Sequence, residues 1–345
     1  MTPPPRLSVV IPAKDAEAHI AEALTSLTHQ GVPGEELEVV LVDDGSSDLT
    51  GEVAAGFADR FGSFRLLRSE RPTGVAAARN RGLRAARGEA LTFLDADDWY
   101  GNGHLAVMLA ALDALGTDSV RTDIILASGK HRSLKAAPVH LRGRRLRCAD
   151  YTVRGFEQTM VDYPNPPTGV FRRHLLDSGL LLFDEDLRSA EDREWNWRLM
   201  LESETFAVVD TPGVYYRRDV AGSITAVYDE TQLDFIASCA KTLARTRALG
   251  CSNAHTLKAA HNLFALADLH LQRRAEMSRR LRTELIRRVA EVGAGLSEDD
   301  LTALLGSFTR KRQAALRPIL REIERRRSSA TMPRPTAPDT PRRSA

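Results

Sequence analysis

The chain has 345 residues, 43% of them hydrophobic, so it can bury a full core and exceeds the usual size of one domain. No run approaches the roughly 20 apolar residues of a membrane span, and the first residues lack the apolar core of a signal peptide. The three cysteines are too few and too scattered for a disulfide framework or a zinc site. We therefore expect a cytoplasmic protein, and because its net charge is only +2, any basic surface must be local.

Strand and helix patterns alternate through the first 115 residues. Short apolar runs predict buried strands, and apolar residues that recur every three or four positions predict helices. The strands are expected at residues 7–12, 37–42 and 91–94, and the helices at residues 16–30, 49–61 and 103–115, with another that begins at Gly74. This alternation is typical of a doubly wound α/β sheet, in which ligands bind beyond the carboxyl ends of the strands.

Acidic residues follow each of these strands. They are Asp15, Asp43, Asp44, Asp95, Asp97 and Asp98. Neighbouring carboxylates repel one another unless a cation or a ligand collects them, and Mg²⁺ and Mn²⁺ prefer such oxygens. Two alternatives need no ligand: Asp97 or Asp98 could be the N-cap of the helix at 103–115, and the pair after the second strand could be ordinary turn residues.

The segment from Arg71 to Leu83 carries small and polar residues in a helical pattern. Its alanines let the helix approach another backbone closely, while Arg79 can hold a phosphate and Asn80 can fix a sugar or a loop. The segment lacks the glycine spacing of a dinucleotide fingerprint and of a P-loop. A hydride-transferring enzyme or a P-loop NTPase is therefore disfavoured.

A further acidic pair opens the helix predicted for residues 189–201, with Ser189 as its N-cap. Glu191 and Asp192 fall in its first turn, where acids are favourable even without a catalytic role. Trp195 and Trp197 could form a platform for a sugar, although tryptophan is more often part of a core.

Together these segments resemble the inverting, non-processive glycosyltransferases of family 2 from bacteria. The matching segments are residues 8–15, 42–48, 74–82, 95–98 and 190–192. The resemblance implies an α/β chain with the GT-A fold of nucleotide-diphospho-sugar transferases, which is a Rossmann-like mixed sheet flanked by helices. It also implies a metal-dependent transfer of a sugar from a nucleoside diphosphate to an acceptor hydroxyl, with Mn²⁺ or Mg²⁺ as the cofactor.

The resemblance assigns a role to each motif. Pro12, Ala13, Lys14 and Asp15 would line the nucleotide base, and Asp44, with or without Asp43, would accept a hydrogen bond from it. The diphosphate and sugar would lie near Gly74, Arg79, Asn80, Asp95 and Ala96, and the metal would be held by Asp95 and Asp97. Asp192 would be the catalytic base, with Glu191 beside it. A uridine diphosphate sugar is favoured, although Ala13 and Lys14 replace the usual aromatic residue and Asn, which leaves the base open.

The same chemistry explains why both ends of the site carry charge. Negative charge grows on the departing diphosphate while the acceptor hydroxyl loses a proton, so the site needs a cation and a carboxylate base. Processive relatives carry Gln-x-x-Arg-Trp after the base, and this chain has no such string, which implies a distributive enzyme. We expect it to act on cell-envelope polysaccharide, glycolipid or a secondary metabolite. The rival hypothesis is a catalytically silent nucleotide-sugar-binding or interaction protein.

Two basic segments and one loop are harder to interpret. In the run from Lys130 to Arg147, several arginines face an anionic acceptor or lipid, or they form a solvated edge. They are Arg142, Arg144, Arg145 and Arg147. Asp219 lies near the position of a metal-assisting His of the family, and it is either a substitute ligand or part of a loop that grips the diphosphate through Arg217 and Arg218.

The pattern after residue 228 is helical. We divide the chain into a glycosyltransferase domain (1–228), a helical region (229–327) and a disordered tail (328–345). Helices are expected near 233–249 and 257–292, and Ser297 is expected to cap a last helix that Pro318 kinks. The arginines after residue 310 either contact an anionic membrane at its inner face or remain solvated. No nucleic-acid partner is expected, because no recognised binding module surrounds them.

Overall fold

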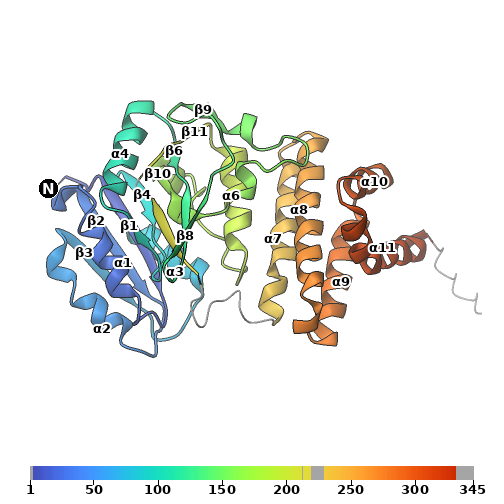
Figure 1. The fold of residues 1–345 in the computed structure, drawn as a ribbon, viewed down its shortest axis with the longest axis horizontal. Coiled ribbons are helices and arrows are strands. Elements are labelled where there is room, and N and C mark those ends of the chain that lie inside the picture. The colour runs from blue at the N-terminus through green and yellow to red at the C-terminus, as the bar shows by residue number, and fades with distance from the viewer. Residues whose placement is uncertain (1–2, 212, 219–228, 332–345) are drawn as a thin grey trace, which may run out of the picture. The chain divides into compact units, whose positions relative to one another are not determined.

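The computed structural model describes residues 3–211, 213–218 and 229–331 (Figure 1). Contacts within the chain group it into two compact units, Met1–Ala259 and Ala260–Ala345. The division falls inside helix α8 (Asn253–Gln272), so helix α7 (Asp234–Ala248) goes with the first unit. The limits expected at residues 228 and 327 remain a prediction about which parts fold independently.

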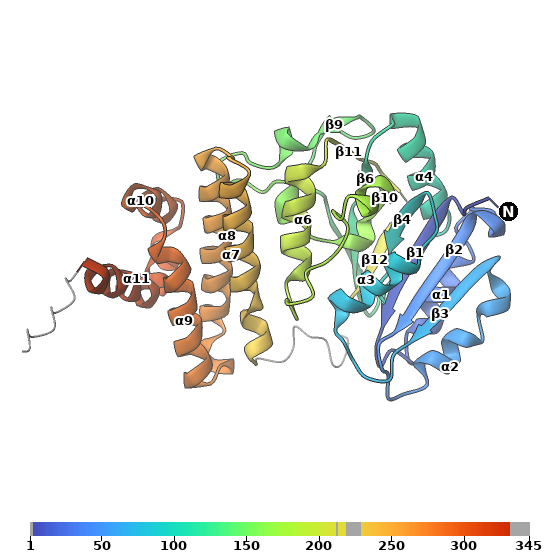
Figure 2. The same cartoon turned by 180° about the vertical axis from the view of Figure 1, so that it is seen from behind.

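The first unit is built on an eight-stranded mixed sheet in the order β3-β2-β1-β4-β10-β6-β11-β9, with helices flanking it (Figures 1 and 2). The strands are β1 (Leu7–Ala13), β2 (Leu37–Asp43), β3 (Ser63–Arg68), β4 (Ala90–Phe93), β6 (Ser119–Arg121), β9 (Leu146–Arg147), β10 (Gly169–Arg172) and β11 (Thr205–Val208). The first four strands of the chain are parallel, and β10 is antiparallel to its neighbours β4 and β6. The predicted mixed α/β sheet is confirmed.

The three strands that precede acidic residues lie side by side. Leu7 of β1 pairs with Leu37 of β2 and with Ala90 of β4, so the carboxyl ends of the strands meet at one edge of the sheet. Every residue of these strands is buried, because helices cover both faces of a parallel sheet, and this explains their mainly apolar sequence.

Helices of the first unit are mostly shorter than their sequence patterns predict. They are α1 (Ile20–Leu27), α2 (Thr50–Ala55), α3 (Val75–Ala85), α4 (His104–Leu115), α5 (His174–Asp177), α6 (Glu191–Glu202) and α7. The close approach expected of the alanines in α3 stays a prediction, but Gly82 lies so near β1 that an added Cβ would be only 2.4 Å from Cγ1 of Val10. The glycine therefore lets α3 pack directly on β1.

A second, four-stranded sheet lies in the same unit. It contains β5 (Trp99–Tyr100), β12 (Val214–Arg217), β7 (Ile124–Ser128) and β8 (His131–Lys135), in that order. Residues 119–127 form two strands, because the polar pair Thr122 and Asp123 separates β6 from β7 and the two strands join different sheets. Within the basic run from Lys130 to Arg147, β8 pairs with β7, which precedes the run, and β9 pairs with β11 of the large sheet.

The core of the first unit contains the tryptophan considered as a sugar platform. Trp195 is fully buried, its ring stacks on Phe183 at 5.1 Å, and its Nε1 donates to the carbonyl of Leu181. Trp197 is also buried. The platform interpretation is therefore wrong for both residues, and they serve the core.

The second unit contains the rest of α8 and three further helices, which are α9 (Arg279–Ala294), α10 (Glu298–Gly306) and α11 (Arg310–Thr331). The continuous helix expected at 257–292 is wrong, because a break precedes α9 and Ser278 caps it. Ser297 caps α10 as predicted, but Pro318 lies in the separate helix α11. Helix α11 reaches Thr331 and so includes the first residues of the segment 328–345 that was expected to form a tail. Within the described ranges, no helix is long and apolar enough to cross a membrane.

Candidate functional site

The loop after β1 is joined to the loop after β2. Pro12 and Ala13 are buried there, whereas Lys14 and Asp15 are exposed. The Asp15 carboxylate accepts hydrogen bonds from the backbone N–H and the hydroxyl of Ser47, at 2.8 and 3.0 Å. These bonds and the ammonium of Lys14 lower the pKa of Asp15 to about 2, so the loop presents a charged carboxylate at any physiological pH.

Asp43 and Asp44 are buried and already bonded within the chain. One oxygen of Asp43 accepts a hydrogen bond from Nε of Arg68 at 3.1 Å. Asp44 accepts hydrogen bonds from the N–H and hydroxyl of Thr73 and from the N–H of Gly74, at 2.7 to 3.0 Å. Gly74 is the N-cap of α3 and has a φ of +99°, so Asp44 fixes the start of this helix. Both acids hold loops rather than pointing free oxygens at a ligand.

Arg79 connects two acidic motifs that lie far apart in the sequence. Its Nη2 donates to Oδ1 of Asp95 at 2.8 Å, and its Nη1 donates to Oε1 of Glu191 at 2.7 Å. The guanidinium also lies over the Phe183 ring, 5.0 Å from its centroid, and the side chain is almost fully buried. Arg79 thus links the end of β4 to the start of α6.

Asn80 resolves the choice between a sugar contact and a loop contact. Its Nδ2 donates to the carbonyl of Phe183 and to Glu185, both at 2.8 Å, and its Oδ1 accepts from the N–H of Phe183 at 2.7 Å. Because both ends of the amide are used, Asn80 holds the loop that leads into α6.

The turn after β4 does not cap a helix. The N-cap of α4 is Gly103, which has left-handed backbone and no capping side chain, so the helix-cap interpretation of Asp97 and Asp98 is wrong. Instead, Oδ1 of Asp98 accepts a hydrogen bond from the N–H of Arg217 at 2.8 Å, and the Arg217 Nε donates to the carbonyl of Asp97 at 2.9 Å. The second sheet therefore supports this turn.

The carboxylates of the turn repel one another. Burial and the charge of Asp95 raise the pKa of Asp97, and the same causes raise that of Asp98 further. Oδ2 of Asp98 is buried and has no hydrogen-bond partner among the described residues. A bound cation would relieve this repulsion. The described residues hold no cluster of three or more metal-binding side chains, so Asp95 and Asp97, on either side of the buried Ala96, would need oxygen ligands from a substrate.

The start of α6 differs from the predicted cap. Ala190, with a φ of +56°, occupies the N-cap position, and the Ser189 hydroxyl instead donates to the carbonyl of Thr231. Glu191 is buried in its ion pair with Arg79. Asp192 is only half-buried and forms no ion pair with any described residue, and burial together with the charge of Glu191 raises its pKa to about 7. A carboxyl group with this pKa is suited to accept a proton near neutral pH.

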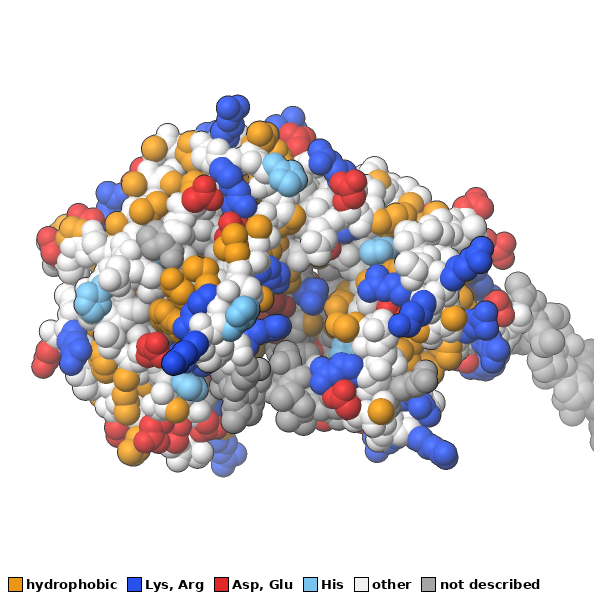
Figure 3. All heavy atoms as spheres, in the orientation of Figure 1, with side chains coloured by type: hydrophobic (Ala, Val, Ile, Leu, Met, Phe, Trp, Pro, Cys, Tyr) orange, Lys and Arg blue, Asp and Glu red, His pale blue; other side chains and the backbone are white. Residues whose placement is uncertain are grey.

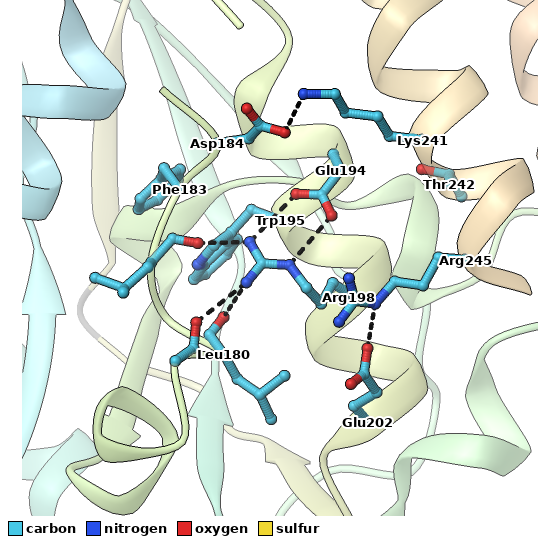
Figure 4. Close-up of polar contacts among 12 residues, drawn as sticks. Leu180, Phe183, Asp184, Glu194, Trp195, Arg198, Glu202, Lys241, Thr242 and Arg245 are labelled. Carbon is cyan, nitrogen blue, oxygen red and sulfur yellow. Dashed lines mark hydrogen bonds and ion pairs between the residues drawn. The ribbon is translucent and has the colours of Figure 1, made fainter. Parts of the chain in front are cut away.

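Several polar contacts hold α6 in place (Figure 4). Arg198 pairs with Glu194 one turn earlier at 3.1 Å and donates to backbone carbonyls in the segment 179–182. Two basic residues of α7 pair with acids around α6. These pairs are Lys241 with Asp184, and Arg245 with Glu202. The spacing of Glu194 and Arg198 by four residues could have indicated their pair, whereas the two pairs with α7 join residues 43 and 57 positions apart and have no local sequence signal.

The arginines at the end of β12 differ in their surroundings. Arg217 forms an ion pair with Glu22 and lies 4.6 Å from the centroid of the Trp99 ring, so it braces the turn after β4. Arg218 is exposed. Asp219 lies outside the described residues, and both of its alternative roles remain predictions.

Two of the four arginines considered for an acceptor are bonded within the unit. Arg142 pairs with Asp123 at 2.9 Å, and Arg145 donates to the carbonyl of Gly116 at 2.7 Å. The two others, which are exposed, are Arg144 and Arg147.

The sequences of known proteins are similar to this one over most of its length. A family model described as Glycosyl transferase family 2 matches residues 8–178. The succinoglycan biosynthesis protein ExoO of Rhizobium meliloti is 30% identical over 264 residues, which cover 72% of each chain. The chain belongs to glycosyl transferase family 2. The uncharacterized glycosyltransferase EpsJ of Bacillus subtilis is 28% identical to this glycosyltransferase over 234 residues, which are 67% of the chain and 66% of EpsJ.

Solved structures support the fold of this glycosyltransferase. Residues 1–349 of TarS from S. aureus superpose with a TM-score of 0.69 at 20% identity, covering 94% of this chain and 91% of the TarS chain. The mannosyltransferase PcManGT of Pyrobaculum calidifontis superposes with a TM-score of 0.53 at 16% identity. These likenesses confirm the GT-A type of fold. The sequence match to full-length TarS covers only 35% of that protein, so this chain spans about a third of it.

Proposed function

We propose that this glycosyltransferase moves a sugar, with inversion at the anomeric carbon, from a nucleoside diphosphate to an acceptor hydroxyl. The observation that carries the proposal is Asp192, a half-buried carboxyl group with a pKa of about 7 that forms no ion pair within the described ranges. Its neighbour Glu191 is joined through Arg79 to Asp95 in the turn after β4. Sugar transfer needs a catalytic base and a site for the departing diphosphate. The bonds of Arg79 join Glu191, the neighbour of the proposed base, to Asp95, which is proposed to lie at the diphosphate.

A uridine diphosphate sugar is the donor we favour. TarS structures contain UDP and UDP-GlcNAc, whereas the PcManGT structure contains GDP-Man with Mn²⁺. We assign the nucleotide sugar to the loops after β1, β2 and β4 and to the start of α3. Lys14, Asp15 and Asp95 would contact it directly, while Asp43, Asp44 and Asn80 would act by holding these loops.

Mn²⁺ or Mg²⁺ suits the carboxylates of Asp95 and Asp97. The raised pKa of Asp97 reflects burial and repulsion by Asp95, which a cation would offset. Two protein carboxylates with the remaining ligands taken from substrate phosphates is a common way to hold Mg²⁺. Such an ion supplies positive charge that stabilises the leaving diphosphate.

The protein's own residues account for the proton. Asp192 accepts the proton of the acceptor hydroxyl while that oxygen forms its bond to the anomeric carbon, on the face opposite the departing diphosphate. The configuration therefore inverts in one displacement. Glu191 is held in its ion pair with the buried Arg79, which leaves Asp192 as the carboxylate of this helix start without an ion-pair partner among the described residues.

Turnover distinguishes this function from the rival one, a silent nucleotide-sugar binder. The experiment measures binding and release of nucleoside diphosphate from a panel of UDP- and GDP-sugars, with Mn²⁺ or with a chelator. We expect one donor to be consumed only with metal. Binding without any consumption across donors and acceptors would support the silent binder instead.

The setting of the reaction is also a proposal. ExoO is named for succinoglycan biosynthesis and TarS as a poly(ribitol-phosphate) β-N-acetylglucosaminyltransferase. These names favour a cell-envelope polysaccharide, glycolipid or similar acceptor over a secondary metabolite. We propose action in the cytoplasm, with α11 as a candidate peripheral contact to the inner face of the membrane.

A further inference from the structure

We propose that the acceptor carries an anionic group, phosphate or carboxylate, close to the hydroxyl that receives the sugar, and that Lys135, Arg193 and Arg218 bind this group. The inference rests on the proposed function, because it assigns the cations to the acceptor side of the same site. It concerns the chemical class of the acceptor, which the site around Asp192 does not otherwise define.

The three cations come from three different elements. Arg193 follows Asp192 directly on α6. Lys135 ends β8, and its Nζ lies 5.5 Å from the centroid of the Tyr163 ring. Arg218 follows β12, and its N–H donates to the carbonyl of Ala127 on β7 at 2.7 Å. Because β7 pairs with both β12 and β8, the second sheet carries two of the three cations.

Their charges influence one another. Partial burial and the charge of Arg193 lower the pKa of Lys135, Arg218 lowers it further, and Asp192 opposes the change. Lys135 therefore lies within electrostatic reach of Arg193, of Arg218 and of the proposed base Asp192. On the face of the molecule in Figure 3, Lys and Arg side chains gather around the second sheet.

The cluster lacks counter-ions. In the part of the chain that the structure describes, none of Lys135, Arg193 and Arg218 forms an ion pair with a carboxylate. Basic residues nearby behave differently, since Arg188 and Arg198 both pair with acids. Three unpaired cations repel one another, and an anion placed among them would remove this repulsion.

Asp192 precedes Arg193 and acts on Lys135, but it cannot serve these cations as a permanent counter-ion. As the proposed base it must take up a proton during each turnover, and its charge then disappears. An anion on the acceptor would leave the cluster neutralised and hold the hydroxyl beside Asp192. It would also offset the repulsion between a charged acceptor and the diphosphate of the donor.

The test uses the full chain saturated with UDP and Mn²⁺, titrated by calorimetry with three small probes. Glycerol 3-phosphate carries a phosphate, glucuronate a carboxylate, and methyl glucoside no charge. We expect at least one anionic probe to bind ten-fold or more tightly than the neutral one, and to lose this advantage at high salt. The stronger of the two anions identifies the group. Equal binding of all three probes would overturn the inference.

Variants connect the binding to the cluster. Lys135→Gln, Arg193→Gln and Arg218→Gln should each weaken binding of the anionic probe five-fold or more, and Arg193→Lys should restore much of it. The matched control is Arg60→Gln, an exposed arginine beside Phe57, which should change nothing. Anion binding that survives all three substitutions would contradict the proposal. The affinity for UDP, measured first, reports separately on the proposed function.

Discussion

The ionisation of Asp192 links chemistry to stability at the scale of a single residue. Burial and the charge of Glu191 raise its pKa to about 7, above the value of about 3.9 in an unfolded chain. The folded protein therefore binds this proton more tightly, so the contribution to stability is full below pH 4 and is lost as the pH rises to about 7.

Asp192→Asn removes this titration. We expect the melting temperature of the variant to exceed that of the native protein by more at pH 8 than at pH 5, measured by thermal unfolding over this range. A difference that is the same at both pH values would contradict the raised pKa.

The buried guanidinium of Arg79 is a second prediction at this scale. Arg79→Met leaves the buried Glu191 without its partner, and breaking a buried ion pair from one side costs about 3–5 kcal/mol of unfolding free energy. Urea unfolding measures the loss. The double variant Arg79→Met/Glu191→Gln should recover a large part of it, because no unpaired charge then remains at Glu191. A loss below about 1 kcal/mol would mean that solvent reaches the pair.

The metal assignment depends on Asp97. Asp97→Asn keeps the size of the side chain but removes its charge, so UDP binding should weaken and should no longer depend on Mn²⁺. Binding is measured by calorimetry with metal and with chelator. The matched control is Asp59→Asn, which removes an exposed carboxylate outside the site. If the Asp97 variant folds and keeps metal-dependent binding, the ligand assignment is wrong.

The sequence singled out the acids of the proposed site, but not what surrounds them. Asp95, Asp97 and Asp192 stand out because they follow strands or open a helix in recognisable motifs. The bonds of Arg79 to Asp95 and Glu191 could not be predicted, since these partners lie 16 and 112 residues away. The same holds for Asp44. Its oxygens were expected to accept a hydrogen bond from the nucleotide base, and in the structure they accept hydrogen bonds from Thr73 and Gly74.

At the scale of an element, the packing of α3 on β1 gives a paired prediction. Gly82→Ala would place a Cβ 2.4 Å from Val10, and such overpacking costs about 1–3 kcal/mol. Gly306→Ala, at the end of α10, meets no atom within 4 Å and should stabilise by about 0.5–1 kcal/mol, because alanine favours helix. Chemical unfolding of both variants tests the opposite signs. A neutral Gly82→Ala would show that α3 can shift away from the sheet.

Strands and helices with one clear pattern of apolar residues were predictable from the sequence, and those with a mixed pattern were not. The buried strands β1, β2 and β4 are mainly apolar, so their positions were predicted to within a residue or two. Strand β3 was missed because it lies at the sheet edge and carries two arginines among its six residues. The division between β6 and β7 depends on which sheet each joins, and that is decided by contacts with β10, β11 and β12.

At the scale of the whole molecule, the basic helix α11 raises the question of membrane contact. Its apolar residues Leu316, Ile319 and Ile323 are buried within the second unit, so they are not available to enter a bilayer. Any contact must be electrostatic. We expect binding to vesicles only when they contain anionic lipid, with loss of binding as salt is added. Flotation assays measure this, and salt-insensitive binding would contradict the electrostatic interpretation.

The overall architecture was the most predictable level. The alternation of strands and helices was sufficient to predict an α/β sheet, the resemblance to family 2 implied that the sheet is mixed, and the site at the carboxyl ends of the strands remains a proposal. The helices after residue 228 were predicted as a group, but their limits were not, because Arg-rich amphipathic sequence continues through the turns that separate them. The acceptor is the least predictable feature, since it depends on side chains from α6 and the second sheet.

The central claim is that Asp192 is the base of a sugar transfer, and turnover of Asp192→Asn tests it most directly. The asparagine keeps the shape at the start of α6 but cannot accept the acceptor's proton. We predict that turnover of the preferred nucleotide sugar falls by about 10²-fold or more while UDP affinity stays within a factor of two, and that Glu191→Gln costs less. Near-normal turnover by a folded Asp192→Asn protein would contradict the account and place the base elsewhere.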